Sequence, residues 1–241
     1  MLNRLQLLRQ RVKAGSSSSK GQILQRFFKT APGEYGAGDK FLGLTVPASR
    51  QIAKEFQDLS FNDLGILIKD PYHELRLIAL LILIEHYQKA KDQKNKQKIV
   101  KFYLQNTKYI NNWDLVDLSV YKIIGDYLVL YPKEKELLNK LARSKDLWEK
   151  RMAMVATFAF LRAGSSQETV RIAEILVNDQ HDLIQKAVGW MLREMGKRLG
   201  EDKLKDFLDD YYQTMPRTAL RYAIERLKPK EREHYLYNAK L

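Results

Sequence analysis

At 241 residues, the sequence is long enough for one large domain or one repeat array with a substantial buried core. It contains no cysteine, which excludes disulfides and thiolate-bound zinc. With 42 Lys and Arg against 29 Asp and Glu, the formal charge of +13 favours a polyanionic partner such as nucleic acid, and solubility alone is the alternative explanation.

The chain opens with a basic stretch, because residues 1–33 contain neither Asp nor Glu. We predict a basic N-terminal segment over residues 1–21 and a helix over residues 22–29. A DNA-facing segment and a transit peptide are both consistent with positive charge around the serine tract 16–19. No cleavable signal opens the chain, and its longest apolar run, residues 77–84, is far too short to cross a bilayer. We therefore expect a cytoplasmic, nucleoid-associated bacterial protein with no membrane part.

Helix-forming residues dominate the rest of the sequence. The 6 prolines and 12 glycines leave long stretches of Leu, Lys, Glu, Ala and Gln, in which apolar residues recur at helical spacing. The one long connector is expected at residues 30–47, which are rich in Gly and Pro. The pattern predicts an all-α protein.

Three segments share one order of residue types. Asp70, Asp146 and Asp179 each precede a short polar step, a basic or amide position and an apolar helical run. The intervals correspond to helical pairs of roughly 33 to 38 residues, as in HEAT or armadillo repeats. Residues 111–117 and 215–227 fill the remaining places. We predict a curved solenoid of HEAT-like or armadillo-like antiparallel helical repeats in a single domain over residues 1–241, with a C-terminal tail over 228–241.

The segment at residues 111–117 contains one of only 3 tryptophans. On a helix, Trp113 and Asp117 are one turn apart, so an indole face and a carboxylate share one side, which suits a cationic ligand. Asn111 and Asp114 have the spacing of a capping box, which explains them without catalysis. Asp117 is a candidate functional carboxylate, and a solvated position or an ion pair to another helix are the alternatives.

The other two tryptophans lie near basic residues. Trp148 is one turn before Arg151, whose planar guanidinium can grip a phosphate; a surface arginine stacked on a core tryptophan is the alternative. Trp190 follows Gly189, a helical glycine that hints at close approach by a backbone or a ligand. Two basic stripes that can bind phosphates are predicted. The first lies near Trp190 and contains Lys186, Arg193 and Lys197, and the second lies on the C-terminal helix and contains Arg217, Arg221 and Lys228.

Other chemistries find no support in the sequence. The 4 histidines are scattered and lack the paired spacing of a zinc site, so we interpret them as structural or solvated. Residues 33–38 are rich in glycine but have no Gly-Lys-Ser ending, and no serine elbow is present. We therefore expect neither a metal nor a cofactor.

Six segments resemble the AlkD-type DNA alkylation repair proteins, which are DNA glycosylases built from HEAT-like repeats. The matching segments are residues 35–50, 72–76, 112–117, 148–151, 186–194 and 215–222. The resemblance implies that Asp117 is the catalytic carboxylate. It further implies that Trp113 and Trp190 flank the sugar of the damaged nucleotide and that Arg151 holds the DNA backbone.

The implied reaction is hydrolysis of the N-glycosidic bond of N3- or N7-alkylated purines in duplex DNA, without base flipping. Such a purine already carries positive charge and leaves as a neutral base, so one carboxylate suffices where ordinary glycoside hydrolysis needs two. For DNA binding we predict Lys186, Arg193, Lys197, Arg217, Arg221 and Trp148. We expect a monomer with no obligate protein partner. A catalytically inactive DNA-binding relative and a HEAT scaffold for protein or RNA are the alternatives.

Overall fold

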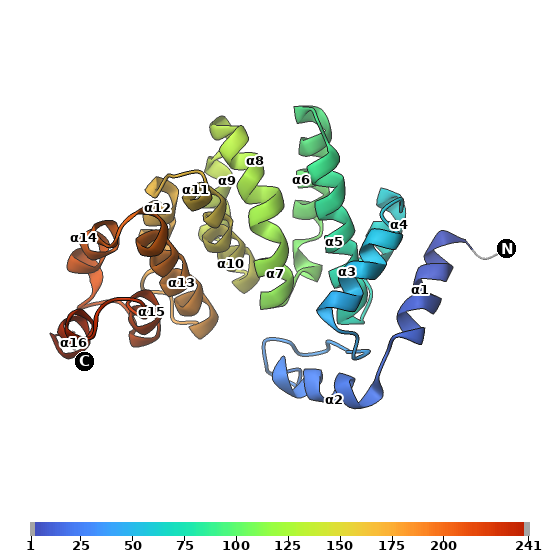
Figure 1. Ribbon diagram of the computed structural model, residues 1–241, viewed down its shortest axis with the longest axis horizontal. Helices are drawn as coiled ribbons and strands as arrows, with labels where there is room; N and C mark the ends of the chain where they lie inside the picture. Colours follow the sequence, from blue (N-terminus) through green and yellow to red (C-terminus); the bar gives the residue numbers. More distant parts are fainter. Residues whose placement is uncertain (1–2, 239–241) are drawn as a thin grey trace. The chain divides into compact units, whose positions relative to one another are not determined.

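The computed structural model describes residues 3–238, and these residues form helices joined by turns and loops (Figure 1). Within this range, extended pairing is limited to one isolated bridge between Lys40 and Tyr72. The prediction of an all-α protein is confirmed. The chain divides into two compact units, Met1–Leu115 and Val116–Leu241. None of the described helices combines the length and the apolar character needed to cross a membrane.

The first unit consists of six helices and the start of a seventh. Their bounds are α1 (Arg4–Ala14), α2 (Ser18–Phe27), α3 (Val46–Glu55), α4 (Phe61–Leu67), α5 (His73–Lys89), α6 (Gln93–Gln105) and α7 (Trp113–Val120). Helix α5 is central, because the apolar run at residues 77–84 is buried on every side of the helix. A helix that is apolar all round needs neighbours on all faces, which explains why this run has no polar stripe.

The basic N-terminal segment belongs to the packed part of the first unit. Leu8 and Val12 of α1 are buried in the core. In the same helix, Arg4 lies 2.9 Å from Asp58 and Arg9 lies 2.7 Å from Asp70. Part of the positive charge that seemed available for DNA is therefore balanced by acids of the same unit. Met1 and Leu2 lie outside the described residues.

The predicted connector runs from Phe28 to Thr45, between α2 and α3. Its end is held by Glu74 of α5, whose carboxylate accepts hydrogen bonds from the backbone N–H groups of residues 42, 43 and 44 at 2.8 to 3.3 Å. Gly43 has a positive φ of 78°, and a Cβ there would lie 2.1 Å from the carbonyl oxygen of Ser17. Only glycine fits this close approach.

The second unit contains the end of α7 and the remaining helices. A single π-helical turn (Tyr121–Gly125) follows α7. The other helices are α8 (Asp126–Leu130), α9 (Glu136–Ala142), α10 (Leu147–Ala156), α11 (Phe158–Arg162), α12 (Gln167–Leu176), α13 (Asp182–Leu199), α14 (Glu201–Tyr211), α15 (Arg217–Ala223) and α16 (Pro229–Asn238). Figure 1 shows α13 and α15 as neighbours, and they share a close packing contact.

The three aspartates that suggested a repeat make the same local bond. In each case the carboxylate accepts a hydrogen bond from the backbone N–H two residues later: Asp70 from Tyr72, Asp146 from Trp148 and Asp179 from His181, at 2.8 to 2.9 Å. Asp146 is in addition the N-cap of α10. Helices α5 and α13 begin three residues after their aspartates. The shared order of residue types therefore encodes a shared aspartate bond at, or three residues before, the start of each helix.

The C-terminal tail is helical where it is described. Arg217 donates a hydrogen bond to the carbonyl of Leu236 at 2.6 Å, and the Tyr235 hydroxyl donates to Asp209 at 3.0 Å. Burial, and next the bond to Asp209, raise the pKa of the Tyr235 hydroxyl well above its ordinary value. Helix α16 is thus docked on the second unit through residues of α14 and α15. Residues 239–241 of the predicted tail lie outside the described residues.

Gly189 marks the closest approach between α13 and α15. A Cβ at this position would lie 2.3 Å from the carbonyl oxygen of Ala219 and 2.5 Å from Cβ of Tyr222. We expect Gly189→Ala to lower the free energy of unfolding by about 1–3 kcal/mol, because backbone atoms must move to admit the methyl group. Urea unfolding measures the change.

Gly65 provides a matched control, because a Cβ there meets only the Phe102 ring at 3.8 Å. Gly65→Ala is expected to raise the free energy of unfolding by roughly 0.5–1 kcal/mol, since alanine favours a helix over glycine. Equal effects of the two substitutions would contradict the packing explanation.

Candidate functional site

Helix α7 contains both Trp113 and Asp117, and the boundary between the two units falls inside it, after Leu115. Trp113 is therefore described with the first unit and Asp117 with the second. The predicted capping box at the start of this helix is wrong for both of its residues. The helix begins at Trp113, the Oδ1 atom of Asn111 accepts a hydrogen bond from Arg76, and the Asp114 carboxylate lies 2.8 Å from Nε2 of His73.

In the second unit, Asp117 forms a bidentate ion pair with Arg151 of α10. The Nε atom of Arg151 donates to Oδ1 at 2.9 Å, and Nη2 donates to Oδ2 at 2.7 Å. The Arg151 side chain is 6% exposed and the Asp117 side chain 17%. A fork of this kind fixes the plane of the carboxylate as well as its position. The structure therefore contains one of the two alternatives to a functional role for Asp117, namely an ion pair to another helix.

Arg151 also donates a third hydrogen bond, to a backbone carbonyl. Its Nη1 atom donates to the carbonyl oxygen of Leu183, near the start of α13, at 2.5 Å. Arg151 therefore joins α7, α10 and α13. With Nε, Nη1 and Nη2 each engaged inside the protein, two of its five N–H groups are left for a DNA phosphate. This placement favours orientation of Asp117 over phosphate binding as the main role of Arg151.

The two tryptophans of the second unit differ in exposure. Trp148 is 7% exposed and belongs to the core, which favours support of α10 over direct contact with DNA. Trp190 of α13 is half-buried, with its ring 6.4 Å from that of Phe158. The guanidinium of Arg198 lies 4.7 Å above the Phe158 ring. Trp190 therefore stands in a partly open aromatic and cationic surrounding, as a nucleic-acid contact requires.

The residues of the two predicted basic stripes differ in whether they are already bound by other groups of the protein. Lys186 lies 2.8 Å from Asp182, Arg193 is paired with Glu225, and Arg217 is used in docking α16. Lys197, Arg221 and Lys228 are exposed and have no ion pair within 4 Å among the described residues, but the charge of Lys228 acts on Glu231. Lys197 and Arg221 are therefore the members of the stripes most available to phosphates.

In the first unit, Trp113 stands among aromatic rings of α2 and the connector. Its Nε1 donates to the hydroxyl of Tyr35 at 3.2 Å. Phe28 stacks on the indole with ring centroids 5.1 Å apart, and Phe27 meets it edge-on at 5.9 Å. The indole is half-buried and its orientation is set by contacts on more than one side.

A buried charged cluster lies next to this indole. His73, which is 2% exposed, has Nε2 2.8 Å from Asp114 and Nδ1 3.5 Å from Asp39. Asp39 in turn lies 2.7 Å from Nη2 of Arg76 and accepts a hydrogen bond from Asn112 at 3.2 Å. Burial works against the charge of Asp39, but bonds to His73, Arg76 and Asn112 outweigh it and lower the pKa of Asp39.

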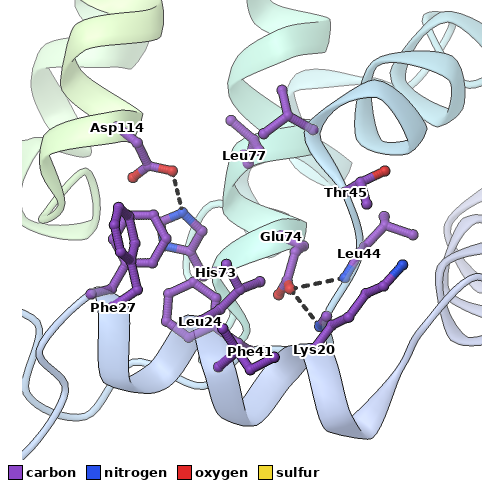
Figure 2. A pocket seen from close by; sticks show the side chains of 14 residues that line it. Lys20, Leu24, Phe27, Phe41, Leu44, Thr45, His73, Glu74, Leu77 and Asp114 are labelled. Atoms are coloured by element: carbon purple, nitrogen blue, oxygen red, sulfur yellow. Dashed lines mark hydrogen bonds and ion pairs between the residues drawn. The ribbon is translucent and has the colours of Figure 1, made fainter.

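An apolar cavity of about 290 Å³ opens beside the cluster, between α2 and α5 (Figure 2). His73 and Asp114 form one end of it, and Lys20, Thr45 and Glu74 are its polar side chains elsewhere. The walls are mainly phenylalanine and aliphatic side chains. The described residues contain no cluster of His, Asp or Glu able to hold a metal ion.

Residues 8–227 match a protein family described as DNA alkylation repair enzyme. The chain belongs to the DNA alkylation repair enzyme family. Its fold is similar to a solved structure described as a predicted DNA alkylation repair enzyme from Enterococcus faecalis. The TM-score is 0.68 at 16% identity, over 89% of this chain and 97% of that chain. No curated protein matches the sequence. The resemblance in the sequence is thus confirmed at the level of the family.

In this member of the DNA alkylation repair enzyme family, the residues of the first unit that surround Trp113 could not be predicted from the sequence. His73 was interpreted as structural or solvated, and its burial agrees with the first of these. The segments at residues 35–50 and 72–76 were recognised as family motifs, but nothing in them indicated that Tyr35, Asp39 and His73 would meet α7. The available signal was the run of polar residues His73, Glu74 and Arg76 at the start of an otherwise apolar helix.

Proposed function

We propose that this protein is a DNA glycosylase that removes N3- or N7-alkylated purines, such as 3-methyladenine and 7-methylguanine, from duplex DNA. It would hydrolyse the N-glycosidic bond in base excision repair without flipping the base. The observation that carries the proposal is the carboxylate of Asp117, held by the Arg151 fork in a chain of the DNA alkylation repair enzyme family.

The chemistry requires little more than a fixed negative charge. An alkylated purine leaves as a neutral base, so the transition state is a sugar cation with no need for a protonated leaving-group donor. We propose that Asp117 stabilises this cation and orients the attacking water, because a preorganised carboxylate needs no rearrangement as charge develops. Trp113 and Trp190 are proposed to lend the electron-rich faces of their indoles to the same sugar.

We further propose that the helices form a curved HEAT-like solenoid and act as one domain. The three repeated aspartate turns and the fold similarity support this arrangement. Duplex DNA would be the partner of a monomeric protein in the bacterial cytoplasm. The formal charge of +13 supports binding of DNA through its phosphates.

The test is release of the damaged base. Wild-type protein is incubated with duplex DNA containing 7-methylguanine, and free 7-methylguanine is measured against an undamaged duplex. Release from the damaged duplex alone is expected. Binding to both duplexes without release would instead identify a non-catalytic DNA-binding relative, and neither binding nor release would favour a scaffold for protein or RNA.

Lys197 and Arg221 provide a second prediction, on DNA affinity. Replacing either by Gln is expected to weaken binding equally for damaged and undamaged DNA, because phosphate contacts do not read bases. Each substitution should reduce the slope of log K against log salt by about 1. Binding measured by fluorescence anisotropy at several salt concentrations gives both values.

The control is Lys94→Gln, which removes one exposed lysine of α6, outside the predicted stripes. It should leave the salt slope unchanged. A slope that stays unchanged in the Lys197 and Arg221 variants as well would exclude both residues from the DNA interface.

A further inference from the structure

Trp113 is held through both of its neighbours in the chain. Asn112, which precedes it, donates a hydrogen bond to Asp39. Asp114, which follows it, lies 2.8 Å from Nε2 of His73. Since His73 is also 3.5 Å from Asp39, its imidazole lies between the two carboxylates that hold the start of α7.

The indole itself is connected to the same imidazole through a ring stack. The His73 ring lies 5.2 Å from Phe28 and 4.7 Å from Phe41, and Phe28 stacks on Trp113. A change in the position of His73 would therefore reach the indole along two routes. One passes through Asp114 and the backbone, and the other through the Phe28 ring.

The charges around His73 balance only when its imidazole is protonated. Asp114 faces it from α7, Asp39 from the connector and Arg76 from α5. Lys20 of α2 lines the adjoining cavity, and the Glu74 carboxylate is turned to the backbone N–H groups of residues 42–44. Two buried or half-buried carboxylates beside one guanidinium leave one negative charge uncompensated, which is costly away from water.

We propose that His73, as an imidazolium, is a positioning residue for Trp113: it bridges Asp39 and Asp114 and so fixes the first turn of α7 and the orientation of the indole. The proposal rests on the proposed function only where it concerns base release. The effect on Trp113 itself is measurable in the protein alone.

The same contacts determine how the contribution of His73 to the stability of the fold depends on pH. Burial alone lowers the pKa of His73, but its hydrogen bonds to Asp114 and Asp39 outweigh burial, and the pKa lies above its ordinary value. A raised pKa in the folded state means that the imidazolium stabilises the fold fully below the unfolded pKa of about 6.5. This stabilisation is lost as the pH rises through the raised folded pKa.

The experiment uses the indole N–H signals of ¹⁵N-labelled protein, of which there are 3, one for each tryptophan. The signal missing in Trp113→Phe identifies Trp113. In wild type we expect this signal to titrate with a midpoint above about 6.5. In His73→Gln the titration should vanish. In the control His86→Gln, which changes another α5 histidine bonded to the Gln57 carbonyl, the titration should persist.

Two outcomes overturn the proposal: a Trp113 signal that does not titrate in wild type, and a titration that survives in His73→Gln. If His73→Gln does not fold, Asp114→Asn decides, because loss of one carboxylate must move the midpoint down, and an unchanged midpoint overturns the proposal. Base release by His73→Gln should fall by roughly 10- to 100-fold at neutral pH, through misorientation of Trp113. If wild type releases no base, the proposed function fails, while the indole titration still tests His73.

Discussion

Asp117→Asn is expected to lower the rate of 7-methylguanine release from duplex DNA by about 100- to 1000-fold, while DNA binding remains close to that of wild type. The amide keeps the shape of the carboxylate and can still accept a hydrogen bond from Arg151, but it has no negative charge. Stabilisation of the sugar cation is therefore lost, while the phosphate contacts that dominate affinity are retained.

The measurements are single-turnover base release and equilibrium binding to the same damaged duplex. Asp182→Asn is a matched control, because Asp182 is also paired with a cation, Lys186, but lies at the start of α13 and is half exposed. Its release rate should equal that of wild type. Equal release by Asp117→Asn and wild type would remove Asp117 from the mechanism, whatever the family membership.

The second large effect is expected on stability, from Arg151→Met. This substitution removes the Arg151 fork from Asp117 and the Arg151 donor from the carbonyl of Leu183, both in a mostly buried surrounding. Breaking a buried pair on one side costs about 3–5 kcal/mol. Urea unfolding should show this loss in the free energy of unfolding of the second unit.

Two comparisons test the cause of that loss. The double variant Asp117→Leu and Arg151→Met should be more stable than Arg151→Met alone, because it has no mostly buried carboxylate that has lost its guanidinium. Arg4→Met, which breaks the exposed pair with Asp58, should have a much smaller effect, since water solvates the partner that is left. A double variant no more stable than the single one would show that packing, and not loss of the guanidinium from the Asp117 carboxylate, causes the lower stability.

Arg76 and Arg151 are bound in the same way, so this arrangement of a buried arginine is a recurring structural feature of the fold as well as a candidate catalytic one. Each of these buried arginines pairs with an aspartate from an earlier segment and donates to a backbone carbonyl of a later one: Arg76 to Asp39 and Tyr109, Arg151 to Asp117 and Leu183. Both occupy the basic position in the repeated order of residue types. The difference is that Asp39 is deeply buried, whereas the Asp117 side chain is 17% exposed.

Helices, their starting turns and the connector could be predicted from local order in the sequence. The Asp146 cap is set by residues within a few positions, and the Gly- and Pro-rich residues 30–47 mark the connector, so a short window of sequence contains both signals. The close approach at Gly189 is to Ala219 and Tyr222 of another helix, and only the glycine itself is a local signal of it. The capping box at Asn111 failed because a distant residue, Arg76, takes the Asn111 oxygen. Local preference gives way wherever a long-range hydrogen bond competes for the same atom.

By itself, the sequence determined an all-α chain of the DNA alkylation repair enzyme family, with Trp113, Asp117, Arg151 and Trp190 as its candidate site. Only the tertiary structure decided which charged side chains remain available to bind a ligand. It placed Arg151 on Asp117, gave Arg193 an acidic partner in Glu225, and gathered His73, Asp39 and Asp114 around the start of α7. Helical spacing specifies which residues share a face, but an ion pair between helices depends on how those faces pack, and a single sequence does not record that.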